Sequence, residues 1–174
     1  MTSHGVPFVR LVVLNWNSGD LLARCLDSLH RLDWPGERLE IVVIDNASTD
    51  GSVDGLAASH PGVRLVRNSS NTGFGANNLA LADLDGVDQV GLVNPDVVVE
   101  SGWIRELSQM LIDDPGLGAA CPKILLDDGG EPRIQNAGSL IDSSGNSRDR
   151  GYGDTDGEGY TDSVEVDAWC GAAV

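Results

Sequence analysis

The sequence is poor in basic residues, in cysteine and in long apolar segments. Its 11 lysine and arginine residues stand against 27 aspartate and glutamate residues, which gives a formal net charge of -16 at pH 7. Because phosphate backbones select surfaces rich in lysine and arginine, this balance argues against a nucleic-acid partner. A small anionic ligand would need local help from backbone N–H groups, a helix N-terminus or a metal ion, since the net field repels it.

The few cysteines and the short apolar runs exclude further classes. Cys25, Cys121 and Cys170 are odd in number and lack CxxC spacing, so they indicate buried reduced thiols rather than a disulfide framework or a zinc site. No apolar run approaches the roughly 20 residues of a spanning helix, and no secretory signal opens the chain. We therefore predict no membrane-spanning segment and a cytoplasmic location, which includes a peripheral place at the inner face of the membrane.

Length and composition predict one folded domain. With 174 residues and 41% hydrophobic content, the chain can bury one substantial core but is too short for two ordinary domains. Its 22 glycines and 7 prolines are spread along the chain, which is typical of a globular protein and not of a disordered tract.

Strand-like and helix-like segments alternate up to residue 113. Apolar runs rich in β-formers, each with a polar end, predict buried parallel strands at 9–15 and 40–45, and shorter apolar runs followed by polar residues predict further strands at 63–67 and 89–93. Helical patterns follow at 21–29, capped by Ser18 or Asp20, then from near Asp50, through 79–82, and at 103–112. This alternation predicts an α/β fold with a mainly parallel sheet and helices on both faces.

Beyond residue 113 the pattern becomes irregular. Short apolar runs at 119–126 and 134–141 precede a polar, glycine-rich segment at 142–163, and the chain finishes on a strand-like stretch at 164–174. We expect residues 142–163 to form one long flexible loop. Loops of that length are usually lids, binding loops or disordered, and a functional loop and plain disorder both stay open.

Polar residues follow each predicted strand. They are Asn15-Trp16-Asn17, Asp45-Asn46, the loop 71–78 and Asn94-Pro95-Asp96. For each group alone, a turn or a helix cap is the simpler interpretation. Because ligands bind outside the carboxyl ends of parallel strands, however, the four groups together predict one binding site at that edge of the sheet.

The residue types at this edge suggest roles. Asp45 and Asn46 pair a carboxylate with an amide, which can read the N–H and C=O edge of a pyrimidine, whereas Ser48 and Asp50 suit caps of the following helix. The loop containing Asn71, Gly73 and Asn77 is only a weak dinucleotide fingerprint. Its small residues and backbone N–H groups stand at a helix start, where an anion or a ribose can approach.

Asp96 is the candidate metal ligand. Magnesium or manganese is commonly held by one or two carboxylates together with the phosphates of the substrate, so a single aspartate at a strand tip fits. The alternative is that Asn94-Pro95-Asp96 forms only a turn, since these residue types dominate turns.

Four motifs in order carry a family resemblance: VVLNWNSGDLLARCLDSL, EIVVIDNASTDGS, NTGFGANN and LVNPDVVVE. Together they resemble the nucleotide-binding half of family-two glycosyltransferases with the GT-A fold, above all rhamnosyltransferase-like members acting on cell-wall or surface polysaccharide. The resemblance covers nearly the whole chain. It implies a Rossmann-like domain over residues 1–174 that moves a sugar from a nucleoside diphosphate sugar to an acceptor hydroxyl with inversion, the acceptor being a saccharide or a lipid-linked saccharide.

The resemblance also implies residue roles. The motif NPD stands where many members have DxD, so it implies that Asp96, with Asn94 beside it, binds a divalent metal, Mg or Mn, on the donor diphosphate. It places base recognition at Asp45 and Asn46. The first-strand contacts that it implies are Leu14, Asn15 and Trp16.

No catalytic base is visible in the sequence. Glu165 and Asp167 do not stand where the family places its base, so the chain looks like the donor-binding portion, truncated before the acceptor-binding half. A sugar-phosphate nucleotidyltransferase is rejected because NWNSGD lacks a glycine-rich, basic phosphate loop. A non-catalytic or truncated nucleotide-binding module stays open as the alternative function.

Overall fold

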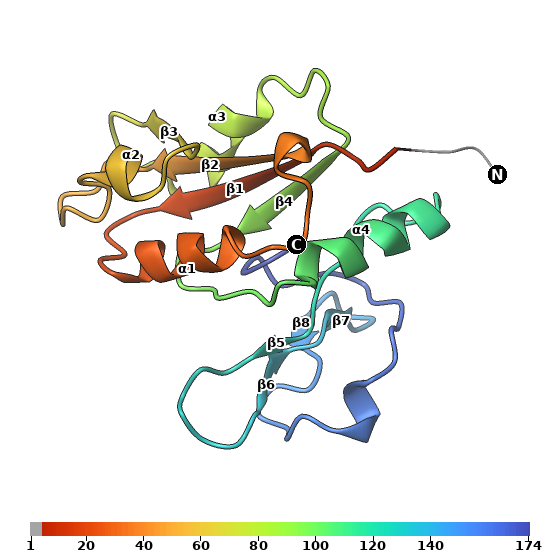
Figure 1. Cartoon of the computed structure of the whole chain (residues 1–174). Helices are drawn as coiled ribbons and strands as arrows, with labels where there is room; N and C mark the ends of the chain where they lie inside the picture. Colours follow the sequence, from red (N-terminus) through yellow and green to blue (C-terminus); the bar gives the residue numbers. More distant parts are fainter. Residues whose placement is uncertain (1–4) are drawn as a thin grey trace.

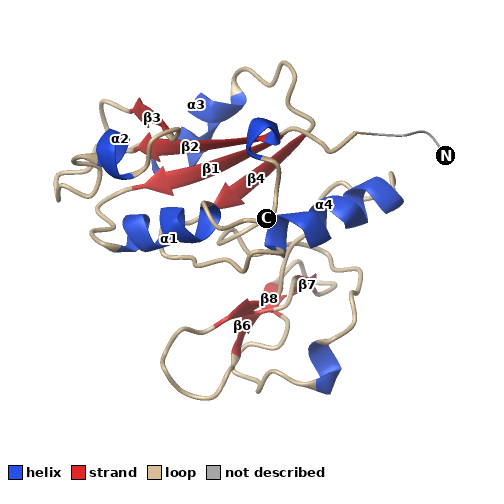
Figure 2. Cartoon of the chain, in the orientation of Figure 1, coloured by secondary structure: helices blue, strands red, loops and turns tan. Residues whose placement is uncertain are grey.

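The computed structural model describes residues 5–174, so residues 1–4 of the expected domain lie outside the described part. A four-stranded sheet with its helices forms the larger part of the molecule, and a smaller lobe of short strands lies beside it (Figures 1 and 2). No helix among the described residues is both long and apolar enough to cross a bilayer.

The sheet is parallel throughout. Its strands are β1 (Val9–Asn15), β2 (Leu39–Asp45), β3 (Arg64–Arg67) and β4 (Gln89–Val93), in the order β3-β2-β1-β4. The predicted bounds of β1 and β4 are confirmed, and those of β2 and β3 differ by one residue at their starts. The α/β class predicted from the sequence is therefore confirmed.

Helices cover both faces of the sheet. The helices α1 (Leu21–Leu29), α2 (Leu56–Ser59) and α4 (Trp103–Asp113) pack on one face, while a 3₁₀ helix, η2 (Gly73–Asn77), and α3 (Asn78–Leu81) pack on the other (Figure 1). Alternate residues of each strand point to opposite faces, so Leu11 and Val13 join the first core and Val12 the second. Burying one such side chain contributes about 1.5–3 kcal/mol.

Two predictions about the helices were wrong. The helix expected from near Asp50 is only α2, because Gly51 and Gly55 adopt positive φ angles of 79° and 70° and break the preceding segment into turns. Neither Ser18 nor Asp20 makes a side-chain cap bond to α1. A short 3₁₀ helix, η1 (Gly36–Arg38), precedes β2.

The second lobe is built from two antiparallel strand pairs. The strand β5 (Ile124–Leu125) pairs with β6 (Ile134–Asn136), and β7 (Ser139–Ile141) pairs with β8 (Ser147–Asp149). The segment expected as one loop, 142–163, thus contains β8 and a 3₁₀ helix, η3 (Glu158–Tyr160). Its flexibility stays a prediction.

The final stretch forms no regular strand, but its last residues pair with the sheet. Leu92 N donates to Val174 O at 2.7 Å, Val174 N donates to Leu92 O at 3.0 Å, and Asn94 N donates to Ala172 O at 2.7 Å. Val93 and Ala173 form an antiparallel bridge. Residues 172–174 therefore cover the outer edge of β4.

Candidate functional site

The parallel register brings the predicted strand tips together. Asn15 at the end of β1 stands opposite Asp45 at the end of β2, and Asp45 stands opposite Arg67 at the end of β3. Asn46 N also donates to Asn15 O at 2.8 Å. The candidate residues of the first three tips therefore line one edge of the sheet, as predicted.

Asn15 is a buried link between two loops. Its side chain has no exposed surface, and Nδ2 donates to Ser48 Oγ at 3.0 Å and to Ser52 Oγ at 2.9 Å, while Oδ1 accepts a hydrogen bond from Ser18 Oγ. Both amide donors are thus used inside the protein. In this structure Asn15 positions the loops after β1 and β2, and its predicted contact with a nucleotide stays a prediction.

Further bonds join the same two loops. Thr49 N donates to Asn17 Oδ1 at 2.8 Å, and Gly19 N donates to Asp50 Oδ2 at 2.8 Å. Hydrogen bonds from Ser52, together with that from Gly19, lower the pKa of the Asp50 carboxyl below its ordinary value. Ser48 and Asp50 therefore cross-link loops, and their predicted role as helix caps is wrong because α2 begins several residues later, after Gly55.

Two residues in these loops have left-handed backbone conformations without being glycine. Asn17 has φ 51° and Ala47 has φ 64°. Such conformations cost on the order of 1–3 kcal/mol and persist where surrounding contacts hold them, which is common at functional sites. Neither conformation was predicted from the sequence, because each depends on the bonds between the loops.

Asn46 connects β2 to the loop after β3. It is 1% exposed, its Nδ2 donates to Asn71 Oδ1 at 2.8 Å and to Gly73 O at 3.2 Å, and its Oδ1 accepts from Asn68 Nδ2 at 3.0 Å and from Thr72 N at 3.2 Å. Every donor and acceptor of this amide is therefore occupied. A base could contact the Asn46 side chain only by displacing one of these bonds.

Asp45 is the better placed member of the pair for base recognition. It is 3% exposed, Oδ1 accepts from Ser48 N at 3.0 Å, and Oδ2 lies 3.6 Å from Arg67 Nη1. Beside it, Leu14 is half-buried against the second core and Trp16 is 55% exposed. Arg67 was missed in the sequence, although a basic residue at a strand tip of so acidic a chain was an available signal.

The loop 71–78 offers only short helices at its expected ligand site, and its predicted contact with an anion or a ribose stays a prediction. Gly73 has φ 66°, and the helix that follows η2 is α3, which has only four residues and therefore concentrates little positive charge at its start. Asn77 is 4% exposed and donates from Nδ2 to Phe74 O at 3.1 Å, while its Oδ1 has no partner among the described residues.

Asp96 is an uncommitted carboxylate beside the tip of β4. It is exposed, and among residues 5–174 it forms neither an ion pair nor a side-chain hydrogen bond. Burial, and after it the negative charge of Asp96, raises the pKa of the Cys25 thiol to about 12. Cys25 Sγ lies 3.6 Å from Asn94 O. No group of three or more His, Cys, Asp or Glu side chains in the described part could hold a metal. The site thus offers one carboxylate, which fits a cation held mainly by substrate phosphates.

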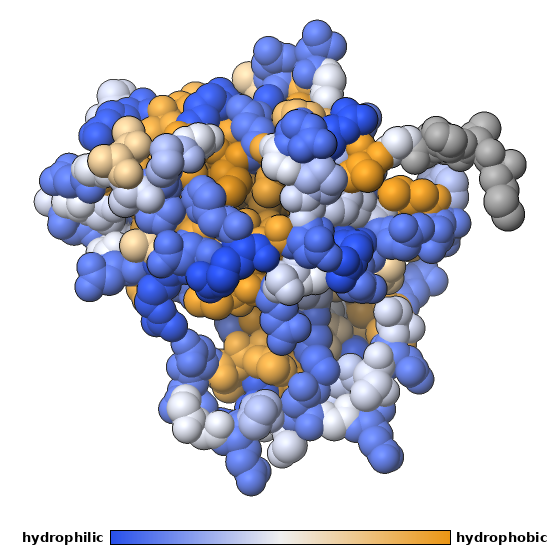
Figure 3. All heavy atoms as spheres, viewed as in Figure 1, coloured by the Kyte–Doolittle hydropathy of each residue, from blue (hydrophilic) through white to orange (hydrophobic). Residues whose placement is uncertain are grey.

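A large cleft opens beside Asp96. It has a volume of about 1330 Å³ and lies between the β4–α4 side of the sheet and the second lobe. Apolar side chains such as Val97, Met110 and Val166 line it together with Arg24, Lys123 and Arg150. In Figure 3 the surface is hollowed between the two parts and apolar atoms show there. The cleft exceeds the 300–1,000 Å³ typical of small-molecule pockets.

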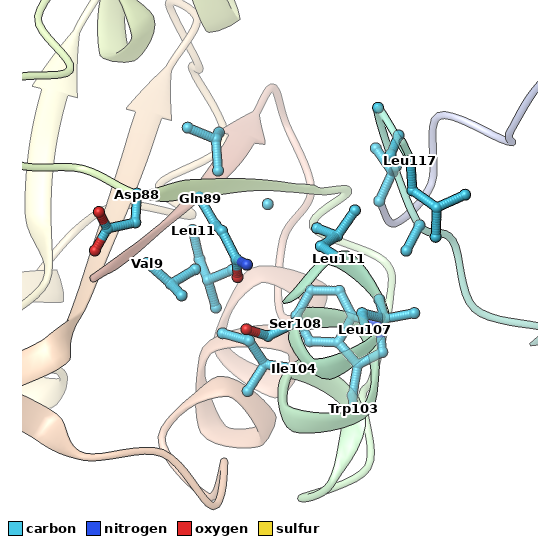
Figure 4. A pocket seen from close by; sticks show the side chains of 16 residues that line it. Val9, Leu11, Asp88, Gln89, Trp103, Ile104, Leu107, Ser108, Leu111 and Leu117 are labelled. Carbon is cyan, nitrogen blue, oxygen red and sulfur yellow. The ribbon is translucent and has the colours of Figure 1, made fainter. Parts of the chain in front are cut away.

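A second cavity, of about 470 Å³, lies away from Asp96 and from the polar strand tips. Figure 4 shows it between α4 and the first residues of β1 and β4, with Val9, Leu11, Leu107 and Leu111 around it. This is the amino end of the strands, opposite the polar tips. Ser108 Oγ and Trp103 Nε1 are buried without partners among the described residues, and the acid in the lining, Asp88, accepts a hydrogen bond from Phe8 N at 2.7 Å. We do not place the functional site in this cavity.

The two acids near the end of the chain do not join the strand tips. Asp167 Oδ2 accepts a hydrogen bond from Ile141 N at 2.8 Å, which ties it to β7 in the second lobe, and Glu165 is exposed. Neither gains support as a catalytic base from these contacts.

Comparisons with known proteins agree with the family resemblance of the four sequence motifs. The family described as "Glycosyl transferase family 2" matches residues 11–169. The chain is 32% identical over 144 residues to N-acetylglucosaminyl-diphospho-decaprenol L-rhamnosyltransferase of Mycobacterium tuberculosis, covering 75% of this chain and 46% of that protein. It is 31% identical over 107 residues to beta-monoglucosyldiacylglycerol synthase of Synechocystis sp., covering 58% of this chain and 22% of that protein.

Solved structures resemble the chain as well. The mannosyltransferase PcManGT of Pyrobaculum calidifontis, in complex with GDP-Man and Mn²⁺, has a TM-score of 0.63 and 30% identity, over 69% of this chain and 36% of its own. TarS of S. aureus in complex with UDP-GlcNAc has a TM-score of 0.52 and 20% identity, over 69% of this chain and 38% of its own, and this likeness concerns the fold alone. The chain spans less than half the length of each of these proteins.

Proposed function

Because the chain belongs to glycosyl transferase family 2, we propose that it binds a nucleoside diphosphate sugar at the carboxyl edge of its sheet and transfers the sugar to an acceptor hydroxyl. The Rossmann-like sheet is the GT-A arrangement expected for that family. The relatives support transfer in cell-wall or surface polysaccharide synthesis, and a saccharide or lipid-linked saccharide is the proposed acceptor.

The proposal rests mainly on one observation, the convergence of polar strand tips that are cross-linked to one another. Asn15 and Asn46 hold three loops through buried amides, while the Oδ2 oxygen of Asp45 has Arg67 as its one partner among the described residues. Loops held in advance bind a ligand with a smaller loss of conformational entropy. In this site Asp45 recognises the base, and Leu14 and Trp16 flank it.

We assign the donor diphosphate to the region of Asp96 and Asn94, with a divalent cation, Mg or Mn. The uncommitted carboxylate of Asp96 supports this assignment, as does the presence of Mn²⁺ in the related mannosyltransferase. A bound cation would stabilise the charge that develops on the leaving diphosphate. Asp96 would hold the cation, and Asn94, whose backbone N–H is fixed by Ala172, would stand beside it.

The proposed transfer proceeds with inversion, which requires a base to deprotonate the acceptor hydroxyl on the face opposite the leaving group. We assign no residue to this role. The alternative is a nucleotide-binding module without transfer, and it is favoured because no catalytic base is identified among the described residues. The proposed location is the cytoplasm or the inner face of the membrane, where a lipid-linked acceptor would be reached.

Calorimetry with GDP and UDP tests the donor site. We expect binding with Mn²⁺ or Mg²⁺ and little binding with a chelator, and we expect Asp96→Ala to remove this metal dependence. Asp20→Ala is the matched control, because Asp20 is another exposed carboxylate at the same edge and makes no cap bond. Equal affinity with and without metal, in wild type and in Asp96→Ala, would contradict the assignment.

Transfer is tested separately from binding. Acceptor-dependent release of nucleoside diphosphate, followed with saccharide and lipid-linked saccharide acceptors, supports the enzyme. Binding without any release in this chain supports the non-catalytic alternative, since losing a general base alone costs a factor of about 10²–10⁴.

A further inference from the structure

Most basic side chains of this acidic protein are already neutralised by carboxylates. Among residues 5–174, ion pairs involve seven of the 11: Arg10, Arg24, Arg64, Arg67, Arg105, Lys123 and Arg133. The remaining four are Arg31, Arg38, Arg148 and Arg150. Of these four, only Arg150 lines the cleft beside Asp96.

Arg150 is held in place by uncharged groups. Its Nη1 donates to Ala137 O at 3.2 Å and its Nη2 donates to Gly159 O at 3.1 Å. Its guanidinium carbon lies 4.8 Å from the centre of the Tyr160 ring. These contacts fix the side chain, use only part of its five N–H donors, and leave its charge without a carboxylate partner in the described part of the chain.

The neighbouring backbone makes this arrangement possible. Gly151 has φ 80°, and a Cβ at this position would lie 2.8 Å from Tyr160 Cε1, so only glycine leaves room for the ring. The Tyr160 hydroxyl in turn donates to Asp154, which holds the ring from its other end. The position of the guanidinium is thus set by three separate segments of the second lobe.

The other two basic side chains that line the cleft each pair with a carboxylate. Arg24 Nη2 lies 3.2 Å from Asp127 Oδ2, and Lys123 Nζ lies 2.5 Å from Asp156 Oδ1. An anion entering the cleft would have to compete with those carboxylates. At Arg150 it would meet a fixed guanidinium with free N–H groups, which is the side chain best matched to phosphate oxygens.

We propose that Arg150 is an anion-binding residue of the cleft and that it binds a phosphate or diphosphate group of a substrate. The role of that substrate in transfer rests on the proposed function, whereas anion binding itself does not. Two sources share this chemistry, the donor diphosphate held near Asp96 and a phosphate carried by the acceptor.

Chemical modification of the wild-type protein tests the proposal without any variant. Phenylglyoxal reacts with free guanidinium groups, and the rates at Arg150 and at Arg148 are followed by peptide mass spectrometry, with and without inorganic diphosphate and with chelator present. Arg148 is the matched control, since it lies two residues away, has no ion pair and does not line the cleft. At about four times the Kd we expect diphosphate to slow modification of Arg150 about fivefold, because a fifth of the sites stay free, and to leave Arg148 unchanged.

Variants identify the source of the anion. Calorimetry compares wild type, Arg150→Met, Arg150→Lys and Arg148→Met for inorganic diphosphate and for GDP or UDP with Mn²⁺. Weaker nucleotide binding in Arg150→Met alone, partly restored in Arg150→Lys, points to the donor. Unchanged nucleotide binding with weaker diphosphate binding points to the acceptor. Equal protection of Arg150 and Arg148, with equal diphosphate affinity in all four proteins, overturns the proposal even if Asp96 binds metal as expected.

Discussion

Replacing Asn46 with alanine tests whether a buried amide organises the proposed nucleotide site. The substitution removes four hydrogen bonds, two donated to Asn71 and Gly73 and two accepted from Asn68 and Thr72. It leaves the backbone bond from Asn46 N to Asn15 O intact. The loop 69–73 should therefore separate from the end of β2, while Asn68 N keeps its backbone bond to Asp45 O and the sheet itself stays formed.

The magnitude follows from how far water can replace each lost partner. A hydrogen bond contributes a net of about 0.5–1.5 kcal/mol, and a buried group left without a partner costs about 1–3 kcal/mol. Asn71, Thr72 and Gly73 are exposed and can turn to water, whereas Asn46 is 1% exposed and leaves a buried space. We expect a loss of about 2–4 kcal/mol in the free energy of unfolding, which is about 4–16 °C in Tm for a chain of this size.

Urea unfolding and thermal melts measure this loss, and nucleotide calorimetry follows the site. Asn71→Ala is the control, because it removes only one of the bonds of Asn46, together with the bond from Gly73 N to Asn71 Oδ1. It should cost less than half as much. A cost for Asn46→Ala below that for Asn71→Ala, or unchanged nucleotide affinity in a folded Asn46→Ala protein, would refute the organising role.

Further predictions concern the base, the buried thiol and the second lobe. Asp45→Ala should weaken nucleotide binding by about 1.5–3 kcal/mol and reduce preference among bases, as measured by calorimetry with GDP, UDP and ADP; unchanged preference would leave Asp45 a purely structural role. The folded pKa of Cys25 is about 12 against an ordinary 9.0, so the unfolded thiol ionises first as pH rises. Unfolding free energy should fall between pH 9 and 12 by up to about 1.4 kcal/mol per unit, and Cys25→Ala should lack this part of the slope in urea titrations. Gly138→Ala places a Cβ 2.5 Å from Val166 at a residue with φ 95°, and hydrogen exchange should show the second lobe destabilised by more than about 2 kcal/mol. Gly145→Ala is the control and should cost less, because Gly145 has a similar φ of 84° but no atom lies within 4 Å of the added Cβ.

The elements with a clear apolar pattern were predictable from the sequence. The run at 9–15 is rich in β-branched residues and ends in Asn15, and the apolar run at 89–93 is followed by polar residues; the structure gives β1 and β4 these bounds. The turns that replace most of the helix expected from near Asp50 were not predictable, because the left-handed conformations of Gly51 and Gly55 depend on the fold. At 164–174 the apolar pattern indicated a strand, whereas only residues 172–174 reach β4.

The gathering of the candidate residues was predictable from the sequence, whereas their contacts were not. Polar residues after buried strands were expected to meet at one edge of the sheet, and the first three strand tips do so. The sequence could not show that Asn15 and Asn46 bond to serines, asparagines and backbone groups in other loops, since such pairings are non-local. Arg150 was missed for a related reason: its distinction is the lack of a carboxylate neighbour, which only the three-dimensional arrangement reveals.

The pairing of residues 172–174 with β4 has a consequence for self-association. An open strand edge is a template on which a second chain can add its own strand, and this leads to aggregation. At β4 the bonds of Leu92 and Asn94 to Val174 and Ala172 occupy that template. At the opposite edge, β3 is four residues long and has an arginine at each end, so it is short and charged. In the described part of the chain, the parallel sheet therefore presents no long, flat, apolar edge to another molecule, and the polar loops of the proposed site can stay open to solvent without such an edge beside them.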